Sequence, residues 1–277
     1  MLEHFKVAAA QMCSNDNPEK NFDECEKLIA DAHEEKARLV ALPENFAFLG
    51  STVDDSLNFC QPLNSILFNK YKSLAKKYTI WISYGGFQEQ IPGDTKHCYN
   101  SHVLVNPAGE IAAIYRKIHL FSVNLPGQIQ LDESEHTRAG ATVTCAQTEL
   151  GVAGLAICYD LRFAELFITL RQLGAEFILL PAAFTFETGC AHWEILLRAR
   201  AIETQCYVIA AAQYGRHNPN RKSYGHALIV DPWGNFIAQA SDTSQIITAT
   251  LSHKILSHVR SAIPIAAHRI LELLPKF

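Results

Sequence analysis

The sequence has neither an excess of basic residues nor a long apolar segment. Among its 277 residues, 24 are Lys or Arg and 28 are Asp or Glu, and the net charge is −4. Nucleic-acid surfaces need clustered basic residues, and a membrane-spanning helix needs about 20 consecutive apolar residues. We therefore expect no nucleic-acid or membrane partner. The first residues include the acid Glu3 and lack the basic start of a secretory signal, so a cytoplasmic location is expected.

Closely spaced pairs of cysteines are also absent. None of the 8 cysteines belongs to a Cys-x-x-Cys pair, whereas structural zinc sites usually contain such pairs. A chain of this size without a secretory signal is expected to keep its thiols reduced. The sequence therefore predicts no metal site, and most of the thiols are expected to be small buried side chains.

The sequence does contain short apolar runs that alternate with amphipathic stretches. Runs rich in Val, Ile and Ala predict strands buried on both faces, at residues 6–12, 38–42, 80–84, 152–157, 177–180 and 207–212. Apolar residues at spacings of three and four predict helices at 17–36, 66–77, 163–173 and 193–204. Strands that alternate with helices favour an α/β fold.

One supersecondary pattern occurs twice. Residues 103–113 and 228–238 each contain two apolar runs joined by an Asn/Asp-Pro-x-Gly turn, which predicts a β-hairpin. The strands and helices that precede the hairpins also correspond, which indicates two similar halves at about 1–120 and 150–251. Chance similarity is the alternative explanation, because identity between the halves is low. No linker separates them, so we predict one domain over residues 1–277. Two such halves would form a four-layer αββα sandwich, bridged by an irregular loop at 121–140.

Three positions carry reactive side chains at the ends of predicted strands. Cys158 follows a buried run and precedes a helix that begins near Arg162, and a helix start favours a thiolate. Glu44 directly follows the buried run 38–42, and Lys117 ends the first hairpin. Each residue also has an ordinary structural explanation. Cys158 could be a packed thiol, Glu44 an acid in solvent, and Lys117 a cation on an edge strand.

Together, these positions resemble a known family. Pro43-Glu44-Asn45, Tyr115-Arg116-Lys117-Ile118-His119 and Ile157-Cys158-Tyr159-Asp160-Leu161-Arg162-Phe163 are similar to the three signatures of the nitrilase superfamily of carbon–nitrogen hydrolases, in the same order. The family fold is the αββα sandwich. The resemblance implies an amidase without metal or organic cofactor, in which Cys158 attacks the amide carbonyl and forms a thioester. Glu44 would be the general base, and Lys117 would stabilise the oxyanion.

The resemblance also implies a second glutamate in the loop after the lysine. Glu133 is the choice, although its neighbours Asp132 and Glu135 leave the register open. Relatives commonly have Phe-Pro-Glu after the cysteine motif, where this chain has Ala164 in place of proline. Because alanine forms helices well, little functional effect is expected.

A more specific resemblance concerns the substrate. The run 192–217 is similar to the branch of amidases that act on deaminated glutathione, with ω-amidases of α-ketoglutaramate as the sister branch. The substrates of both branches are small amides with an α-keto acid carboxylate. The resemblance implies that Arg162 binds this carboxylate and that Phe184 and Thr188, in the loop after the strand at 177–180, line the pocket. The structural alternatives are pairing of Arg162 with Asp160 or Glu165, and a plain core role for Phe184.

Two other classes of protein remain open at this point. A cysteine–histidine hydrolase would find partners among the 12 histidines, and an interaction module could retain the fold without activity. Family members commonly associate as dimers through outer helices, so a homodimer or a higher homo-oligomer is expected. The apolar helix around Leu166, Phe167 and Leu170, and residues 255–277, are candidates for the contact, although an interior core face is the plainer explanation for the helix.

Overall fold

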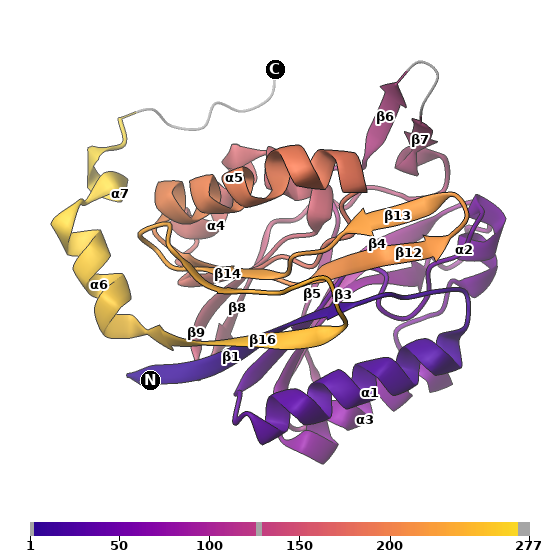
Figure 1. The fold of residues 1–277 in the computed structure, drawn as a ribbon, viewed down its shortest axis with the longest axis horizontal. Helices are drawn as coiled ribbons and strands as arrows, with labels where there is room; N and C mark the ends of the chain where they lie inside the picture. Colours follow the sequence, from indigo (N-terminus) through magenta and orange to yellow (C-terminus); the bar gives the residue numbers. More distant parts are fainter. Residues whose placement is uncertain (1–2, 126–128, 271–277) are drawn as a thin grey trace.

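The chain folds into two β-sheets packed face to face, with helices on both outer faces (Figure 1). This computed structural model describes residues 3–125 and 129–270. The first sheet has the order β13 (Arg221–Tyr224), β12 (Ala212–Asn218), β1 (His4–Met12), β2 (Leu39–Leu42), β3 (Trp81–Gln90), β4 (Cys98–Val105) and β5 (Ile111–Arg116), with β16 (Gln245–Ser252) also paired to β1. The second sheet has the order β15 (Phe236–Gln239), β14 (Leu228–Val230), β11 (Tyr207–Ala210), β10 (Phe177–Leu179), β9 (Gly151–Leu155) and β8 (Thr144–Thr148).

The outer layers complete a four-layer sandwich. Helices α1 (Pro18–Glu34) and α3 (Ile66–Tyr78) cover the first sheet, and α4 (Ala164–Gln172) and α5 (Phe186–Thr204) cover the second (Figure 1). Helix α1 begins where the sequence indicates, because the Asn17 side chain accepts hydrogen bonds from the amides of Glu19 and Lys20 and Pro18 occupies the first turn. The predicted αββα fold is confirmed.

The two halves share one strand order. In the first half, β1, β2 and β3 are parallel neighbours, and β4 and β5 follow as antiparallel strands. In the second half, β9, β10 and β11 are parallel neighbours, and β14 and β15 follow as antiparallel strands. The repeat predicted from the two hairpins is therefore present in the topology.

The halves nevertheless do not form independent sheets. The predicted strand 207–212 is interrupted at Ala211: β11 stays in the second sheet, whereas β12 crosses to the first and pairs in parallel with β1. Strand β13 follows β12 in this sheet, and β16 runs antiparallel to β1. The first sheet thus contains strands from both ends of the sequence.

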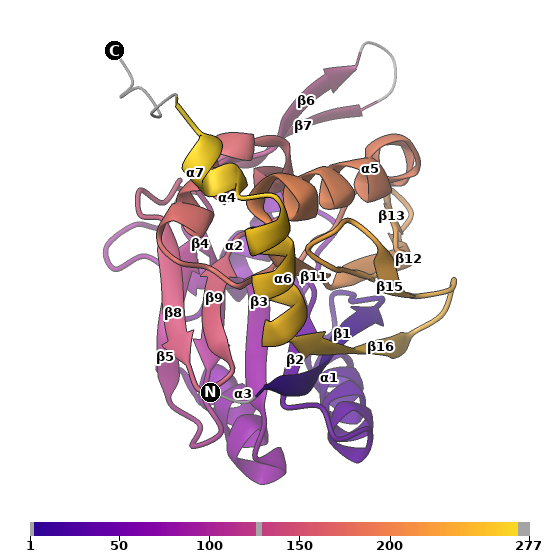
Figure 2. The ribbon, with the colours of Figure 1, turned by 90° about the vertical axis from the view of Figure 1, so that its left-hand side faces the viewer.

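Two regions differ from the sequence prediction. The first is residues 121–140, which are not an irregular loop: they contain a hairpin of β6 (Ser122–Leu125) and β7 (Ile129–Asp132), followed by the 3₁₀ turn η1 (Glu133–Glu135). Figure 2 shows this hairpin standing away from the body of the molecule. Pro126 and Gly127, which suggest an irregular loop in the sequence, lie outside the described residues.

The second region is the start of helix α5, which begins at Phe186 rather than at residue 193, so Thr188 lies in its first turn and not in a loop. Glycine weakens a helix, but the missing side chain of Gly189 serves a close contact here. A Cβ atom at this position would lie 2.2 Å from Cβ of Tyr224 on β13. Helix α4 begins at Ala164, the position where proline would also have been compatible.

The remaining helices lie on the edge of the sandwich. They are α2 (Val53–Phe59), α6 (His253–Ala262) and α7 (Ile265–His268). Residues at the end of α6 pack on their own chain, because Gln205 Nε2 donates to Ile263 O and Arg260 Nη2 donates to Ala175 O. Residues 271–277, which were candidates for crossing to a partner, lie outside the described residues. No helix in residues 3–125 and 129–270 has the length and apolar character needed to cross a membrane.

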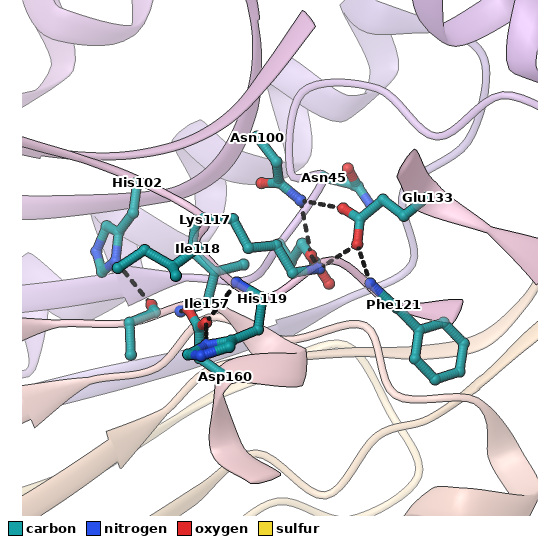
Figure 3. Close-up of polar contacts among 12 residues, drawn as sticks. Asn45, Asn100, His102, Lys117, Ile118, His119, Phe121, Glu133, Ile157 and Asp160 are labelled. Carbon is teal, nitrogen blue, oxygen red and sulfur yellow. Dashed lines mark hydrogen bonds and ion pairs between the residues drawn. The ribbon is translucent and has the colours of Figure 1, made fainter. Parts of the chain in front are cut away.

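A buried histidine joins the two sheets. His102 on β4 is fully buried, and its Nδ1 donates to Ala156 O, just beyond β9, over 3.1 Å (Figure 3). Since a carbonyl can only accept, the neutral ring accepts at Nε2 from Ser83 Oγ at 2.7 Å. Burial lowers the pKa of His102 to about 4, so the ring is neutral in the folded protein near neutral pH.

Mild acid is expected to destabilise the fold through His102. The unfolded side chain titrates near pH 6.5 and the folded one near pH 4, so the unfolded chain binds a proton first as the pH falls. His102 should therefore lower the free energy of unfolding by about 2 kcal/mol between pH 7.5 and pH 5. Urea unfolding at both pH values measures this change. The variant His102→Asn should show a weaker pH dependence, and an unchanged dependence would contradict the assignment.

Candidate active site

Four of the predicted residues converge where strands of both sheets end. Glu44 follows β2, Lys117 follows β5 directly, and Glu133 opens η1. Cys158 comes from the second half, where it opens the 3₁₀ turn η2 (Cys158–Arg162) after β9. All four side chains line one cavity of about 810 Å³. The site therefore needs both halves of the sandwich.

Lys117 lies between two carboxylates. Its Nζ is 3.0 Å from Glu44 Oε1 and 2.7 Å from Glu133 Oε2, and only 2% of the Lys117 side chain is exposed. Asn100 on β4 links the same two carboxylates, because its Nδ2 donates to Glu44 Oε1 at 2.9 Å and to Glu133 Oε1 at 3.1 Å. In Figure 3, Asn100, Lys117 and the amide of Phe121 all point toward Glu133. Glu44, Lys117 and Glu133 are called the ion cluster below.

The structure also shows which acid of the bridging segment lies against Lys117. Glu133 makes this contact, whereas the Asp132 side chain accepts hydrogen bonds from the amide and hydroxyl of Ser134. The Glu133 carboxylate accepts a further bond from the Phe121 amide at 2.8 Å. Asn100 has no sequence signal of this kind, because an asparagine inside a strand does not indicate what its side chain contacts.

The charges of the ion cluster stabilise one another. Burial raises the pKa of Glu44, but Lys117 and hydrogen bonds from Cys158, Lys117 and Asn100 outweigh it and hold the pKa below its ordinary value. Burial likewise opposes the charge of Lys117, while Glu133 and Glu44 raise its pKa above the ordinary value. The carboxylate and the ammonium are therefore both charged at neutral pH.

The Cys158 thiol, by contrast, is protonated at rest. Burial and the Glu44 charge raise its pKa well above the ordinary value, and they outweigh Lys117 and a backbone hydrogen bond with Ala183. These effects outweigh the helix start, which by itself favours a thiolate, so the thiol still needs a base. The physical reason is that a buried thiol beside the charged Glu44 disfavours becoming a second anion.

The backbone at Cys158 is held in an unusual conformation. Its φ is +45°, in the left-handed region that residues with a Cβ atom rarely adopt. The Cys158 amide donates to Pro181 O at 2.9 Å, which ties the turn to the end of β10. Asn45, next to Glu44, also has a positive φ of 59°. Such strain persists where surrounding contacts fix the backbone, as is common in functional sites.

A buried aspartate clamps the lysine segment to the cysteine turn. Asp160 is fully buried, and its Oδ2 accepts from Tyr115 Oη at 2.7 Å and from the Ile157 amide at 2.8 Å. Its Oδ1 contacts His119 Nδ1 at 2.7 Å (Figure 3). Tyr115 and His119 flank Lys117 in sequence, so Asp160 sets the distance between Lys117 and Cys158. Sequence alone did not reveal this role, because an acid beside an apolar run is usually solvated.

Two glycines permit a close approach behind Glu44. A Cβ atom on Gly86 would lie 2.6 Å from Glu44 Cγ, and one on Gly85 would lie 1.9 Å from Pro181 Cβ in the second half. Gly86 also has a φ of +67°. On its other side, the Glu44 carbonyl accepts from Gln213 Nε2 at 3.0 Å. The backbone that carries Glu44 is thus fixed by neighbours from three segments of the chain.

The three residues predicted to bind substrate line the same cavity. The Arg162 guanidinium lies over the rings of Tyr159 and Phe184, at 5.7 and 5.5 Å, and Nη1 donates to His192 Nδ1 at 3.3 Å. Among the described residues it forms no ion pair, so the alternative of pairing with Asp160 or Glu165 is not observed. Phe184 is 7% exposed and belongs to both the core and the cavity wall.

A cysteine–histidine contact does occur among the described residues, between Cys13 Sγ and His217 Nδ1 at 3.5 Å, but neither residue lines the cavity. In the described part of the chain no histidine hydrogen-bonds to Cys158, and His136 is the one histidine in the cavity lining. His102 and His119 serve the structural contacts given above, and His217 binds Ser14 O and Ser223 Oγ. The same part of the chain contains no group of three or more His, Cys, Asp or Glu side chains arranged to hold a metal ion.

Comparison with known proteins agrees with this geometry. The carbon–nitrogen hydrolase family model matches residues 6–260. The chain is 45% identical to deaminated glutathione amidase of Mus musculus, over 95% of this chain and 82% of that protein. It is 43% identical to the nitrilase and fragile histidine triad fusion protein NitFhit of Caenorhabditis elegans, over 96% of this chain, and spans 60% of the length of that fusion protein.

Solved structures show the same fold. The C. elegans NitFhit crystal structure matches with a TM-score of 0.92 and 42% identity, over 97% of this chain and 65% of that one. The crystal structure of Saccharomyces cerevisiae Nit3, described as a member of branch 10 of the nitrilase superfamily, matches with a TM-score of 0.87 and 30% identity, over 97% of both chains.

The fold and its relatives define an enzyme of the nitrilase superfamily, a hydrolase of carbon–nitrogen bonds other than peptide bonds. The chain belongs to the carbon–nitrogen hydrolase family. The substrate class expected from the sequence, a small-molecule amide, agrees with the amidases among its relatives.

Gly86→Ala is expected to lower kcat/KM about 10- to 100-fold, because the new methyl group would displace Glu44 from the ion cluster. The effect is measured by steady-state kinetics with any amide that the wild type hydrolyses. Gly93→Ala is the matched control: Gly93 has a similar φ of +79°, but no atom lies within 4 Å of the place that a Cβ would occupy there. Equal losses in both variants would indicate backbone strain rather than displacement of Glu44.

Proposed function

We propose that this chain is a cysteine-dependent amidase that hydrolyses the amide of deaminated glutathione through a thioester intermediate. The observation that carries the proposal is the buried ion cluster beside the Cys158 thiol, in a cavity that is also lined by the arginine Arg162. The relatives named deaminated glutathione amidase support the choice of substrate.

In the first half of the reaction, Glu44 takes the thiol proton as Cys158 Sγ attacks the amide carbonyl carbon. Proton transfer and attack occur together, because the raised pKa of the thiol disfavours a thiolate before the substrate is attacked. The carbonyl oxygen becomes an oxyanion, which the Lys117 ammonium stabilises. Protonated Glu44 then gives its proton to the nitrogen, the C–N bond breaks, and the amine leaves.

In the second half, Glu44 takes a proton from water as the water oxygen attacks the thioester. Lys117 again stabilises the oxyanion, the C–S bond breaks, and Cys158 regains its proton as the carboxylic acid product forms. Glu133 orients Lys117 through the 2.7 Å contact and keeps it charged. Because two carboxylates flank one ammonium, proton uptake by Glu44 also neutralises the excess negative charge of the cluster.

Substrate orientation is assigned to the wall opposite the ion cluster. Arg162 would bind the α-keto acid carboxylate in a bidentate ion pair, since its guanidinium has no carboxylate partner in the described residues. Phe184 would pack on the carbon chain, and Thr188 would complete the wall. An ω-amidase of α-ketoglutaramate is the alternative, because its substrate has the same keto acid end. The volume of about 810 Å³ favours the longer substrate.

Substitutions in the site should separate the proposed roles. Cys158→Ala is expected to abolish turnover, and Glu44→Gln and Lys117→Ala should each lower kcat about 100- to 10,000-fold. Cys190→Ala removes an exposed thiol and is the matched control, with activity near that of the wild type. Product formation is measured by chromatography. Survival of activity in both Glu44→Gln and Lys117→Ala would refute the mechanism.

The same assay tests the substrate. With the wild type, kcat/KM should be higher for deaminated glutathione than for α-ketoglutaramate. The opposite preference would assign the chain to ω-amidase while leaving the mechanism intact, and turnover of neither compound would reject both substrates.

We also propose that residues 1–277 act as one domain, in the cytoplasm and as a homodimer. The apolar face of α4 named from the sequence (Leu166, Phe167, Leu170) is buried in the chain's own core and is unsuited to the contact. Exposed apolar side chains instead lie on α5 and the nearby β14–β15 hairpin: Ile195 is 70% exposed and Trp233 is 54% exposed.

Sedimentation velocity should therefore give about twice the mass of one chain. Ile195→Glu should shift the protein to monomer, because the dimer contact would bury the new charge. Ile66→Glu, on exposed α3, is the control and should leave the mass unchanged. A wild type that sediments as a monomer would reject this proposal.

A further inference from the structure

The cavity has a second group of cations, apart from the ion cluster and Arg162. The turn between β12 and β13 reaches the cavity wall, where Arg216, Arg221 and Lys222 all contribute to the lining. The segment 216–222 contains no acid. The cavity lining also contains acids such as Glu135 and Glu187, so the positive charge that would attract an anion is local to this segment.

These cations lack carboxylate partners in the residues that the structure describes. Arg221 is half-buried and forms no ion pair there, and Arg216 Nη1 donates to Pro219 O within the turn. The Lys222 ammonium lies 3.7 Å from the centre of the Phe186 ring. Their charge is therefore available to a ligand.

The turn is also held in place before any ligand binds. His217 Nδ1 contacts Ser14 O and His217 Nε2 contacts Ser223 Oγ, both at 2.8 Å, and Asn218 Nδ2 donates to Gly50 O at 3.3 Å. A site whose backbone is fixed in advance loses less entropy when it binds an anion.

The position of the turn relative to Arg162 decides which part of a substrate it can reach. The Arg162 guanidinium lies over Phe184, and β13 runs along the other side of this segment, since the Tyr224 amide donates to Phe184 O and Thr185 pairs with Ser223. Arg162 and Arg221 are thus on different parts of one wall. A substrate bound by its carbonyl carbon at Cys158 extends in two directions, and only one end can occupy Arg162.

We propose that the β12–β13 turn (residues 216–222), with Arg221 as its main cation, is a second anion subsite that binds a carboxylate on the amine side of the scissile amide. This inference rests on the proposed function and deepens it. The acyl side of the substrate carries the α-keto acid for Arg162, and the leaving amine carries the second carboxylate, as the cysteinylglycine part of deaminated glutathione does. The subsite selects amides of carboxylate-bearing amines over primary amides.

The test compares two substrates that differ only at the far end: deaminated glutathione and its analogue with the glycine carboxylate converted to a neutral carboxamide. For the wild type, kcat/KM should be about 10- to 100-fold higher with the carboxylate, the range for one charged hydrogen-bonded pair. In Arg221→Ala this ratio should fall to near one, and Arg221→Lys should restore part of it. Lys76→Ala removes an exposed cation on the far side of the first sheet and should keep the wild-type ratio.

The outcomes separate this inference from the proposed function. If the wild type hydrolyses both substrates equally well, or if Arg221→Ala lowers kcat/KM for both by the same factor, the subsite is refuted while the amidase function stands. An equal loss of kcat/KM with both substrates in Arg221→Ala would mean that Arg221 binds the keto acid end. If the wild type hydrolyses neither substrate, the proposed substrate and the subsite both fail. Turnover of the carboxamide analogue also reports that each variant is folded.

Discussion

The rest of the site depends on one buried ammonium held between two carboxylates. Lys117 is almost completely removed from water, and such a charge is stable only when its partners and hydrogen bonds replace the lost hydration. Glu44 from the first half and Glu133 from the bridging segment provide that replacement, and Asn100 hydrogen-bonds to both carboxylates. The same arrangement raises the pKa of the Cys158 thiol, because burial and the Glu44 charge disfavour a thiolate. In the proposed mechanism, proton transfer from Cys158 to Glu44 therefore coincides with attack on the substrate.

The repeated fold places different chemistry at equivalent positions. In the first half, the strand that ends in Pro43 is followed by Glu44, the proposed base. In the second half, the equivalent strand ends in Pro181 and is followed by small residues, and here the proposed nucleophile comes from the preceding strand. The halves meet closely, since Gly85 contacts Pro181 and Asp160 binds the residues on either side of Lys117. One half therefore holds the base and the cation, the other holds the thiol, and the contacts between the sheets set their distances.

Substrate recognition is separated from this chemistry. In the proposed mechanism, the ion cluster would act on any amide, whereas the arginines at the cavity wall would distinguish between amides by their ends. Arg162 stands beside the thiol on η2, and the β12–β13 turn belongs to a strand that crosses from the second half to the first sheet. That crossing brings residues from late in the sequence to the mouth of a site built mainly from earlier ones. Relatives with the same four-layer fold can thus share a reaction and differ in substrate.

The sequence by itself was enough to predict the layers and the repeat and to name the residues proposed to react. Periodic apolar runs predict strands and helices because burial follows the geometry of each element, and the three motifs around Glu44, Lys117 and Cys158 are local patterns. Tertiary structure alone decided that the strand 207–212 divides between two sheets, that Thr188 lies in a helix, that Glu133 rather than its neighbours contacts Lys117, and that the thiol is not a thiolate. These features depend on contacts between residues far apart in the chain and on the burial and summed charges of the site, and neither can be read from a local stretch of sequence.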